Sequence, residues 1–383
     1  MVNTNYVRRK GKDELNIKAG VRKYVEDNLS CKCYEHALVF PFKSFTIGGV
    51  CDKDGSFIRN SSLHERLDNN VYKYKENEII ESNEEAIFIG TLCNIYGHAI
   101  TDNLKKIWFL KTDSFKSLVN NGCKIVYLNC IYTNPLTELV LRILRYSGVN
   151  IEEIYEVRQI TRFKKLYIPD DSSRYDPDTD IRYYTKEFKE TINDIKRGIV
   201  FNGIIYDKLY FSRAHYSSIK DIGNGEVTIE KFFSDQGYKV IYPEKHSFEE
   251  QIGMLMHCDS FAASEGSVSH NSIFCNDGVN IIILRKSNWI NPYQLAINEM
   301  INANVTYVDA HHSIIKKNEP WIGPFYMYPT KELTNFLCIN SSSIKNRWLK
   351  KDWYKYLFEV LKFRFQRSCP FTYSIVKKIK HLF

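Results

Sequence analysis

The sequence predicts an α/β protein with two successive domains and a basic helical tail. Its 383 residues exceed what one ordinary hydrophobic core organises. Two patterns of alternating strand-length and helix-length apolar segments follow one another, with a break near residue 195. Positive charge is concentrated at the carboxyl end. We therefore expect an N-terminal α/β domain at 1–195, a second domain at 196–343 and the tail at 344–383.

The composition is that of a soluble globular protein, with 44% hydrophobic and 26% charged residues. The first twenty residues lack the apolar core of a signal peptide, and no later segment has the length of a bilayer span. The ten cysteines are scattered, with Cys31 and Cys33 the closest, so neither a disulfide framework nor a zinc ribbon is expected. These features predict a cytoplasmic protein.

The first half alternates strands and helices after a less regular start. Residues before about 85 alternate less cleanly, and we expect them to form an antiparallel or irregular layer. Beyond them we expect strands at 84–92, 123–130 and 163–170, and helices at 97–115 and 134–148.

The second half alternates more regularly and predicts a parallel sheet with right-handed crossovers, that is, a Rossmann-like domain. The expected strands are 207–213, 238–244, 259–264, 280–286 and 305–310, and the expected helices are 227–237, 247–258, one from about 269, and 291–300. Ligands bind such sheets at the carboxyl ends of the strands, which is where Arg213 and the segment Ser264–Asn271 fall.

The tail is strongly basic. Between Ile344 and Phe383, eleven Lys and Arg residues stand against two acids, whereas the net charge of the whole chain is only +8. Its apolar residues recur at helical spacing: Trp353, Tyr356, Leu357, Val360 and Leu361. A basic amphipathic helix of this kind is typical of a segment that lies on an anionic membrane. The alternative is that its aromatic face packs on the body of the protein.

His98 and Asp102 are candidates for acid–base chemistry. Residues four apart share a face of a helix, so the two side chains should meet just after a strand. An imidazole paired with a carboxylate is a reasonable general-base arrangement. Taken alone, the pair is better explained as a helix-surface contact that has no catalytic role.

A second group of polar residues suits a ligand with phosphate and hydroxyl groups. Arg213 could bind a diphosphate with both arms of its guanidinium, or pair with a nearby acid. In S-E-G-S-V-S-H-N, backbone N–H groups at a helix start, freed by Gly266, favour an anion. Glu265 would repel a bare phosphate but accept hydrogen bonds from sugar hydroxyls. Together these residues suggest a nucleotide-sugar site.

Two other function classes stay open. Asp178 and Asp180 form a D-x-D pattern that could hold a divalent metal in a metal-dependent transferase or hydrolase, or lie in a solvated turn. A non-catalytic membrane-associated scaffold, with the tail as its functional part, is the other alternative. P-loop, serine-hydrolase and zincin signatures are absent, and only the tail would support nucleic-acid binding, so no nucleic-acid partner is expected.

Three blocks, in order, resemble glycosyltransferase family 61, in particular its bacterial surface-polysaccharide branch. The first is "YGHAITDNLKKIWFL", the second is the strand "KLYFSR", and the third is "GYKVIYPEKHSFEEQIGMLMHCDSFAASEGSVSHNSIFC". The resemblance covers roughly residues 85 to 310. It implies a GT-B fold with two Rossmann-like domains, and inverting transfer of a hexosyl or pentosyl group from a nucleotide-sugar without a bound metal. The implied acceptor is a glycan or lipid-linked molecule, as in capsule synthesis at the inner face of the cell membrane.

The resemblance also implies roles for the residues already named. Asp102, or His98 with it, would deprotonate the acceptor, and Arg213 would neutralise the departing diphosphate. The donor site would be lined by Glu265, Gly266, Ser267 and Asn271. Many family members have His-Gly where this chain has Glu265-Gly266, so His270, beside Asn271, is the candidate if an imidazole is used at this corner.

Overall fold

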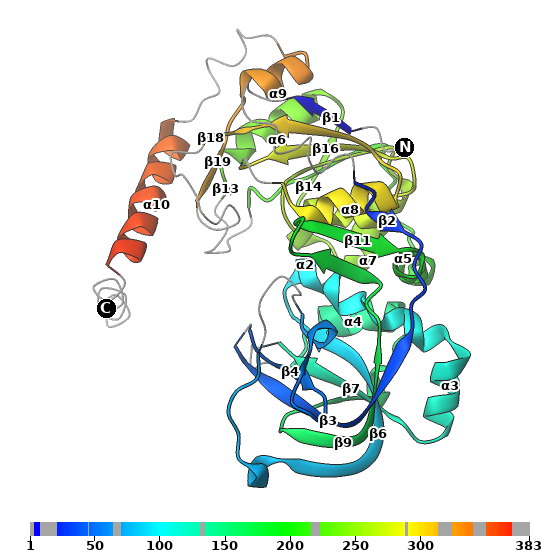
Figure 1. Cartoon of the computed structure of the whole chain (residues 1–383). Helices are drawn as coiled ribbons and strands as arrows, with labels where there is room; N and C mark the ends of the chain where they lie inside the picture. The colour runs from blue at the N-terminus through cyan, green and yellow to red at the C-terminus, as the bar shows by residue number, and fades with distance from the viewer. Residues whose placement is uncertain are drawn as a thin grey trace. The chain divides into compact units, whose positions relative to one another are not determined.

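The computed structural model describes residues 4–7, 21–44, 46–63, 70–130, 135–215, 223–287, 290–312, 324–339 and 350–369. The chain divides into two compact units, coloured along the chain in Figure 1. Unit 1 comprises Met1–Ala19, Gly203–Asn291 and Ile301–Phe383, and unit 2 comprises Gly20–Asn202 and Pro292–Met300.

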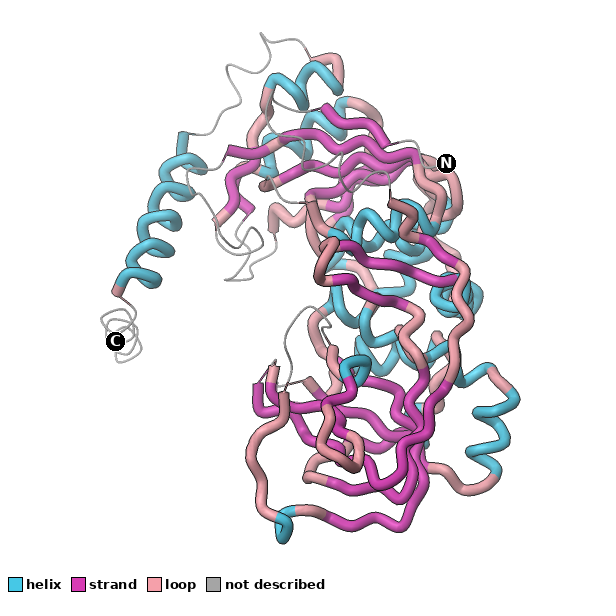
Figure 2. The backbone as a smooth tube through the Cα atoms, in the orientation of Figure 1, coloured by secondary structure: helices cyan, strands magenta, loops and turns pink. Residues whose placement is uncertain are grey.

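Unit 2 is built on a seven-stranded mixed sheet in the order β5-β4-β3-β9-β6-β7-β8, whose longer strands run beside one another in Figure 2. Its strands are β3 (Cys31–Ser44), β4 (Ile47–Cys51), β5 (Phe57–Ile58), β6 (Ile80–Leu92), β7 (Lys124–Asn129), β8 (Ile154–Glu156) and β9 (Thr161–Pro169). Pairing is antiparallel among β5, β4, β3 and β9, and parallel among β9, β6, β7 and β8. The expected antiparallel layer before residue 85 is therefore confirmed.

The helices of unit 2 follow the strands. They are α2 (Tyr96–Ala99), α3 (Asp113–Asn120), α4 (Glu138–Tyr146), α5 (Lys186–Gly198) and α8 (Pro292–Met300). α4 begins at the cap residue Thr137, whose hydroxyl accepts from the N–H of Val140, and buries an apolar stripe. The sheet core is dominated by β-branched and aromatic side chains that alternate along the strands, such as Val39, Phe88 and Val126.

A three-stranded sheet in the order β10-β11-β2 completes unit 2. It contains β2 (Tyr24–Val25), β10 (Ser173–Asp176) and β11 (Ile181–Thr185). Helix α8 packs on β11 and β2, and Glu299 of α8 accepts from the N–H groups of Lys23 and Tyr24 at 2.8 and 3.0 Å. These contacts explain why α8 belongs to unit 2 although the strands on either side of it belong to unit 1.

Unit 1 is built on a fully parallel six-stranded sheet in the order β1-β17-β16-β15-β12-β14. Its strands are β1 (Thr4–Val7), β12 (Lys208–Phe211), β14 (Lys239–Ile241), β15 (Ser260–Ser264), β16 (Asn280–Arg285) and β17 (Asn304–Asp309). β1 pairs with β17 at the edge, where the rings of Tyr6 and Tyr307 stack, and this pairing assigns the amino terminus to unit 1. The α/β class with parallel sheets is confirmed. The predicted boundary near 195 stays a prediction.

Helices cover both faces of the unit 1 sheet, with α6 and α9 on one face and α7 on the other (Figure 1). They are α6 (Glu226–Asp235), α7 (Phe248–His257) and α9 (Lys331–Phe336). Tyr210, Ile229 and Phe232 belong to the core between the sheet and α6, while Phe211 and Phe261 point to the opposite face. A small sheet of β13 (Gly223–Asn224), β19 (Phe325–Met327) and β18 (His311–His312) extends the unit.

The described part of the basic tail forms one long helix, α10 (Lys350–Ser368). One face packs on β19: Tyr356 and Val360 are buried against Tyr326, and the ring centroids of Tyr326 and Trp353 lie 5.2 Å apart. The later turns of the helix extend away from β19 (Figure 1). Among the described residues, none of the helices combines the length and apolar composition that crossing a bilayer requires.

Candidate functional site

His98 and Asp102 meet directly, although the single helix expected at 97–115 is wrong. α2 ends at Ala99, and 3-10 turns follow at Asp102–Leu104 and Ile107–Lys111 before α3 begins. His98 Nδ1 nevertheless lies 2.6 Å from Asp102 Oδ2. The helix breaks because the polar residues of this segment are drawn into the interior to buried partners.

Asp102 is the buried member of the pair. It is 1% exposed, and its Oδ2 accepts from the Tyr293 hydroxyl at 2.7 Å in addition to contacting His98. Arg182 Nη1 lies 3.2 Å from Oδ1. A carboxylate held by a guanidinium, a phenol and an imidazole inside the protein is suited to orienting a neighbour, rather than to touching a substrate.

His98 is the member that solvent reaches, because 19% of its side chain is exposed. Burial works to lower its pKa, but the hydrogen bond and charge of Asp102 prevail and raise the pKa above the ordinary value. When Nδ1 donates to Asp102, Nε2 carries the lone pair that can accept a proton. The geometry therefore fits a base oriented by a carboxylate, with the imidazole as the base.

Arg182 and Tyr293 belong to this cluster, and the sequence did not indicate them. The Arg182 guanidinium carbon lies 3.9 Å from the centroid of the Tyr293 ring, and Nη2 donates to its hydroxyl at 2.9 Å. Burial raises the pKa of Tyr293 well above its usual value, so the phenol stays protonated and donates to Asp102. Tyr293 comes from α8, 191 positions after Asp102, so no local motif could link them.

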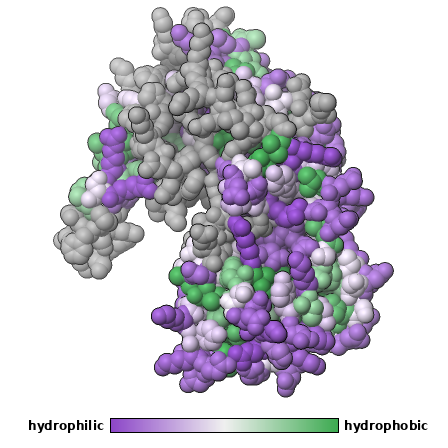
Figure 3. Space-filling view, viewed as in Figure 1, coloured by the Kyte–Doolittle hydropathy of each residue, from purple (hydrophilic) through white to green (hydrophobic). Residues whose placement is uncertain are grey.

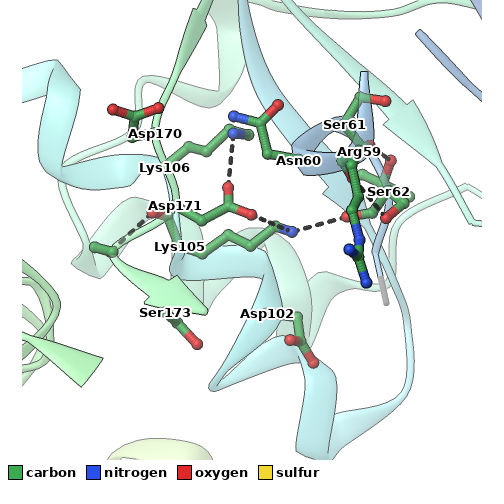
Figure 4. A network of polar contacts seen from close by, with 12 residues as sticks. Arg59, Asn60, Ser61, Ser62, Asp102, Lys105, Lys106, Asp170, Asp171 and Ser173 are labelled. Atoms are coloured by element: carbon green, nitrogen blue, oxygen red, sulfur yellow. Dashed lines mark hydrogen bonds and ion pairs between the residues drawn. The ribbon is translucent and has the colours of Figure 1, made fainter. Parts of the chain in front are cut away.

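Two buried lysines fix the backbone just after Asp102 (Figure 4). Lys105 and Lys106 are 2% and 0% exposed, and their ammonium groups lie 2.9 and 2.6 Å from the two oxygens of Asp171. The two amines also donate to main-chain carbonyls, Lys105 to Ser62 at 2.7 Å and Lys106 to Pro169 at 2.5 Å. One carboxylate thus balances two cations, which ties β9 and the segment after it to the turn that carries Asp102.

In unit 1, the predicted donor residues lie where the order of strands reverses. The chain runs from β12 outward to β14, then returns to β15 on the other side of β12 and continues to β16 and β17. Ligands of doubly wound sheets bind at the carboxyl ends of the two strands that flank such a reversal. Arg213 follows β12 and Glu265 follows β15, so both stand at this position.

Arg213 is half-buried beside two buried acids of α6 that the sequence did not single out. Burial raises the pKa of Glu226. The Tyr210 hydroxyl, which donates to this carboxylate at 2.8 Å, acts to lower the pKa, as do the backbone N–H and the positive charge of Arg213. Glu230 accepts from Ser212 at 2.6 Å and from Tyr242 at 3.3 Å. This network holds the end of β12 in place.

Glu265 is almost completely buried, at 3% exposure. Its Oε1 accepts from the N–H of Asn291 at 3.2 Å, while Oε2 makes no hydrogen bond within the described part of the chain. Burial raises its pKa to about 7, although Arg285 and Lys286 act in the opposite direction. At neutral pH the carboxyl group is therefore protonated about half of the time. The repulsion between Glu265 and a phosphate, which the sequence predicts, is reduced accordingly.

The helix expected after Gly266 is not an α-helix. Residues Ser269–Phe274 form a six-residue 3-10 helix. The Ser269 hydroxyl donates to the carbonyl of Gly266 at 2.8 Å and accepts from its N–H at 3.3 Å, and the Asn271 amide donates to Val268 at 3.1 Å. These side-chain bonds compete with α-helical bonds. A helix therefore begins near residue 269 as expected, but it is a 3-10 helix, and anion binding by its backbone N–H groups stays a prediction.

The remaining donor candidates lie in this same segment. Ser267 is half-buried in the turn, while His270 and Asn271 are 5% and 1% exposed. The structure thus brings Glu265, Gly266, Ser267, His270 and Asn271 together at the end of β15. Their donor-binding roles stay predictions.

The D-x-D pattern lies in a tight turn between β10 and β11. Asp178 is exposed, and its N–H and the Thr179 hydroxyl both donate to Asp176, at 2.9 and 2.7 Å. Asp180 accepts from the Tyr175 hydroxyl at 2.7 Å. Within the described residues, no three His, Cys, Asp or Glu side chains are grouped to hold a metal ion. These bonds favour the solvated-turn interpretation.

Comparison with known proteins finds a similarity to one family. Residues 96–282 match the family model described as Glycosyltransferase 61. The matched segment begins with the turn that carries His98 and Asp102, and it includes Arg182, Arg213 and the whole corner around Glu265. No curated protein matches the chain.

Proposed function

The match to Glycosyltransferase 61 indicates that this chain is a glycosyltransferase, and we propose from this premise that its donor is a nucleotide-sugar. In this proposal the enzyme transfers a hexosyl or pentosyl group to a glycan or lipid-linked acceptor, with inversion of configuration at the anomeric carbon. The observation that carries the proposal is the partly exposed His98, held at 2.6 Å by a buried carboxylate. Such a pair supplies the base that a single in-line displacement requires. A GT-B fold, a role in bacterial capsule or other surface-polysaccharide synthesis, and a mechanism that needs no metal are parts of the same proposal.

In the proposed reaction, His98 Nε2 takes the proton of the acceptor hydroxyl as its oxygen bonds to the anomeric carbon. The bond from that carbon to the donor diphosphate breaks, and its electron pair stays on the diphosphate oxygen. The imidazolium that results is stabilised by Asp102, and Arg213 of unit 1 neutralises the nucleoside diphosphate that leaves. His98 is thus the base and Asp102 its positioning residue, in contrast to a base role for Asp102 itself.

Two variants separate these roles. His98→Gln should lower transfer by roughly 10²- to 10⁴-fold and remove the acid limb of the kcat/KM profile, since the proton acceptor is gone. Asp102→Asn should retain an acid limb, moved to lower pH, because the carboxylate that raises the pKa of His98 is lost. The donor panel would be UDP-, GDP- and dTDP-sugars, with product anomers assigned by NMR. Near-normal turnover of His98→Gln would exclude His98 as the base.

The metal-dependent alternative has a direct test. Asp178→Ala removes the exposed carboxylate of the D-x-D turn but leaves the bond between Tyr175 and Asp180 intact. We expect unchanged transfer by this variant, and unchanged transfer after EDTA treatment of the wild-type protein. Loss of activity in both experiments would favour the metal site.

We also propose that α10 rests on an anionic membrane surface and keeps this cytoplasmic enzyme at the inner face of the membrane. Opposite the face packed on β19, Tyr354, Phe358, Leu361 and Phe365 are 66, 65, 64 and 43% exposed. Their spacing places them on one stripe of the helix. In Figure 3, hydrophobic and strongly hydrophilic side chains of α10 lie next to one another. Exposed apolar residues among Lys and Arg suit an anionic lipid surface.

Vesicle sedimentation tests this contact. The wild type should bind vesicles that contain phosphatidylglycerol and not those of phosphatidylcholine alone. The double substitution Phe358→Glu and Leu361→Glu should abolish binding while transfer to a soluble acceptor continues, because both side chains point away from β19. Undiminished binding by this variant would exclude the stripe, and loss of soluble transfer together with membrane binding would instead favour a structural role for α10.

A further inference from the structure

A second cation stands at the donor corner, on the strand beyond β15. Lys286 directly follows β16, and Ser264 of β15 lies opposite Leu284 of β16 in the sheet register. Two residues further along each strand, Gly266 therefore comes beside Lys286. A Cβ atom added to Gly266 would lie only 3.3 Å from Lys286 Nζ. The ammonium group is thus placed over the face of the corner that the glycine leaves bare.

The surroundings distinguish Lys286 from its neighbour Arg285. Arg285 is 5% exposed and pairs with Asp309 at 2.8 Å, so its charge is balanced inside the sheet edge. Lys286 is only half-buried, and Nζ lies 4.4 Å from the centroid of the Phe325 ring, which limits its directions. The positive charges of Arg285 and Lys286 both act to lower the pKa of Glu265. The buried Oε2 of Glu265 makes no hydrogen bond within the described part of the chain.

Arg213 occupies the matching position on the other side of β15. Phe211, the last residue of β12, pairs with Ala263 of β15, so the two strands end next to one another, and Arg213 and Glu265 each follow one of these ends. Arg213, the Glu265–Gly266 corner and Lys286 therefore follow the carboxyl ends of three adjacent strands, β12, β15 and β16. Neighbouring strands are about 4.8 Å apart, so the ends of β12 and β16 are about 10 Å apart, a separation that two long side chains can bridge to reach one diphosphate.

We propose that Lys286 is a second cationic ligand of the donor diphosphate, and that Gly266 lacks a side chain so that the Lys286 ammonium group can cross the corner. The inference rests on the proposed function and adds to it a residue that binds the leaving group. When the bond to the anomeric carbon breaks, negative charge grows on the diphosphate, and Arg213 and Lys286 bind this charge from both sides.

Calorimetry with UDP, GDP, ADP, CDP and dTDP, each alone, measures the contact directly. Lys286→Met should weaken the best of these ligands by roughly 10- to 100-fold, the usual consequence of losing a charge-assisted hydrogen bond. Lys286→Arg should recover most of the loss. Binding of the corresponding nucleoside, which has no phosphate, should be the same in the wild type and in both variants. A merely structural role would instead weaken the nucleoside as well.

A pair of glycine variants tests the packing. Gly266→Ala and Gly278→Ala both place a side chain at positive φ, +129° and +84°, but only Gly266 has a neighbour within 4 Å, the Lys286 side chain. We expect Gly266→Ala to weaken nucleoside diphosphate binding and Gly278→Ala to leave it unchanged. If Gly266→Ala does not fold, Lys286→Met decides the question.

The outcomes separate this inference from the proposed function. Wild-type binding of a nucleoside diphosphate together with equal binding by Lys286→Met would overturn the role of Lys286 alone. Failure of the wild type to bind any of the five would overturn the nucleotide-sugar donor, and the inference with it.

Discussion

Glu265 makes a quantitative prediction about stability and pH. Burial raises the pKa of its carboxyl group from an ordinary value of 4.5 to about 7 in the folded protein. Between these two values the folded chain keeps a proton that the unfolded chain has released. Stability must therefore fall as pH rises through this window, and it levels off above about pH 7.

The magnitude follows from the shift. Each pH unit in the window costs about 1.4 kcal/mol, so the ionised carboxylate destabilises the fold by about 3 kcal/mol at pH 8. Glu265→Gln removes the titration and keeps the shape and the acceptor for Asn291. The variant should thus gain about 3 kcal/mol over the wild type between pH 4.5 and pH 8.

Urea unfolding of the wild type and of Glu265→Gln at pH 4.5, 6, 7 and 8 provides the assay. The contributions of all other titrating groups cancel when the free energies of unfolding of the two proteins are subtracted. A difference that stays constant with pH would show that Glu265 ionises normally, and the argument from burial would be refuted. A difference that keeps growing at the full slope between pH 7 and pH 8 would instead indicate a still higher pKa. The same variant should retain nucleoside diphosphate affinity, since an amide resembles the neutral carboxyl group.

Further predictions concern unit 2. The charge of Arg182 lowers the pKa of His98, so Arg182→Gln should move the acid limb of kcat/KM to higher pH, opposite to Asp102→Asn; identical shifts in both variants would contradict the assignment. Asp171→Asn leaves two buried ammonium groups without their carboxylate and should cost about 3–5 kcal/mol in urea unfolding. Its control, Asp113→Asn, breaks the exposed pair with Lys116 and should change stability little; equal effects would show that Asp171 is dispensable.

The second half of the fold could be predicted from the sequence because its strands carry a local signal. In parallel sheets covered on both faces, nearly every strand residue is apolar, as in Asn280–Arg285, and such runs contrast clearly with the helices between them. The contact of His98 with Asp102 was also predictable from their spacing of four residues, and it forms although α2 ends at Ala99, before Asp102.

The errors arise where tertiary contacts override local preference. Lys105 and Lys106 lie within the helix expected at 97–115, but Asp171, some 65 positions away, pairs with both in the interior, and the helix breaks. Tyr293 reaches Asp102 from a helix that chain order assigns to the other domain. Lys286 had a usable signal: it is a basic residue just after a strand of a parallel sheet, as Arg213 is.

The buried carboxylates of this enzyme differ in how their charge is balanced, and the difference indicates what each one does. Asp171 is matched by two ammonium groups and Asp102 by Arg182, so each of these carboxylates holds its surroundings in place. Glu265 is buried near cations that do not bond to it, and its pKa of about 7 lets it gain or lose a proton near neutrality. A phosphate that brings negative charge to Lys286 would raise this pKa further and favour the protonated form. Donor binding should then be accompanied by proton uptake above pH 7, measurable as buffer-dependent enthalpy, and this uptake should be absent in Glu265→Gln. Equal proton uptake by the wild type and the variant would assign the proton to another group, and the neutral carboxyl group would have no part in accommodating the diphosphate.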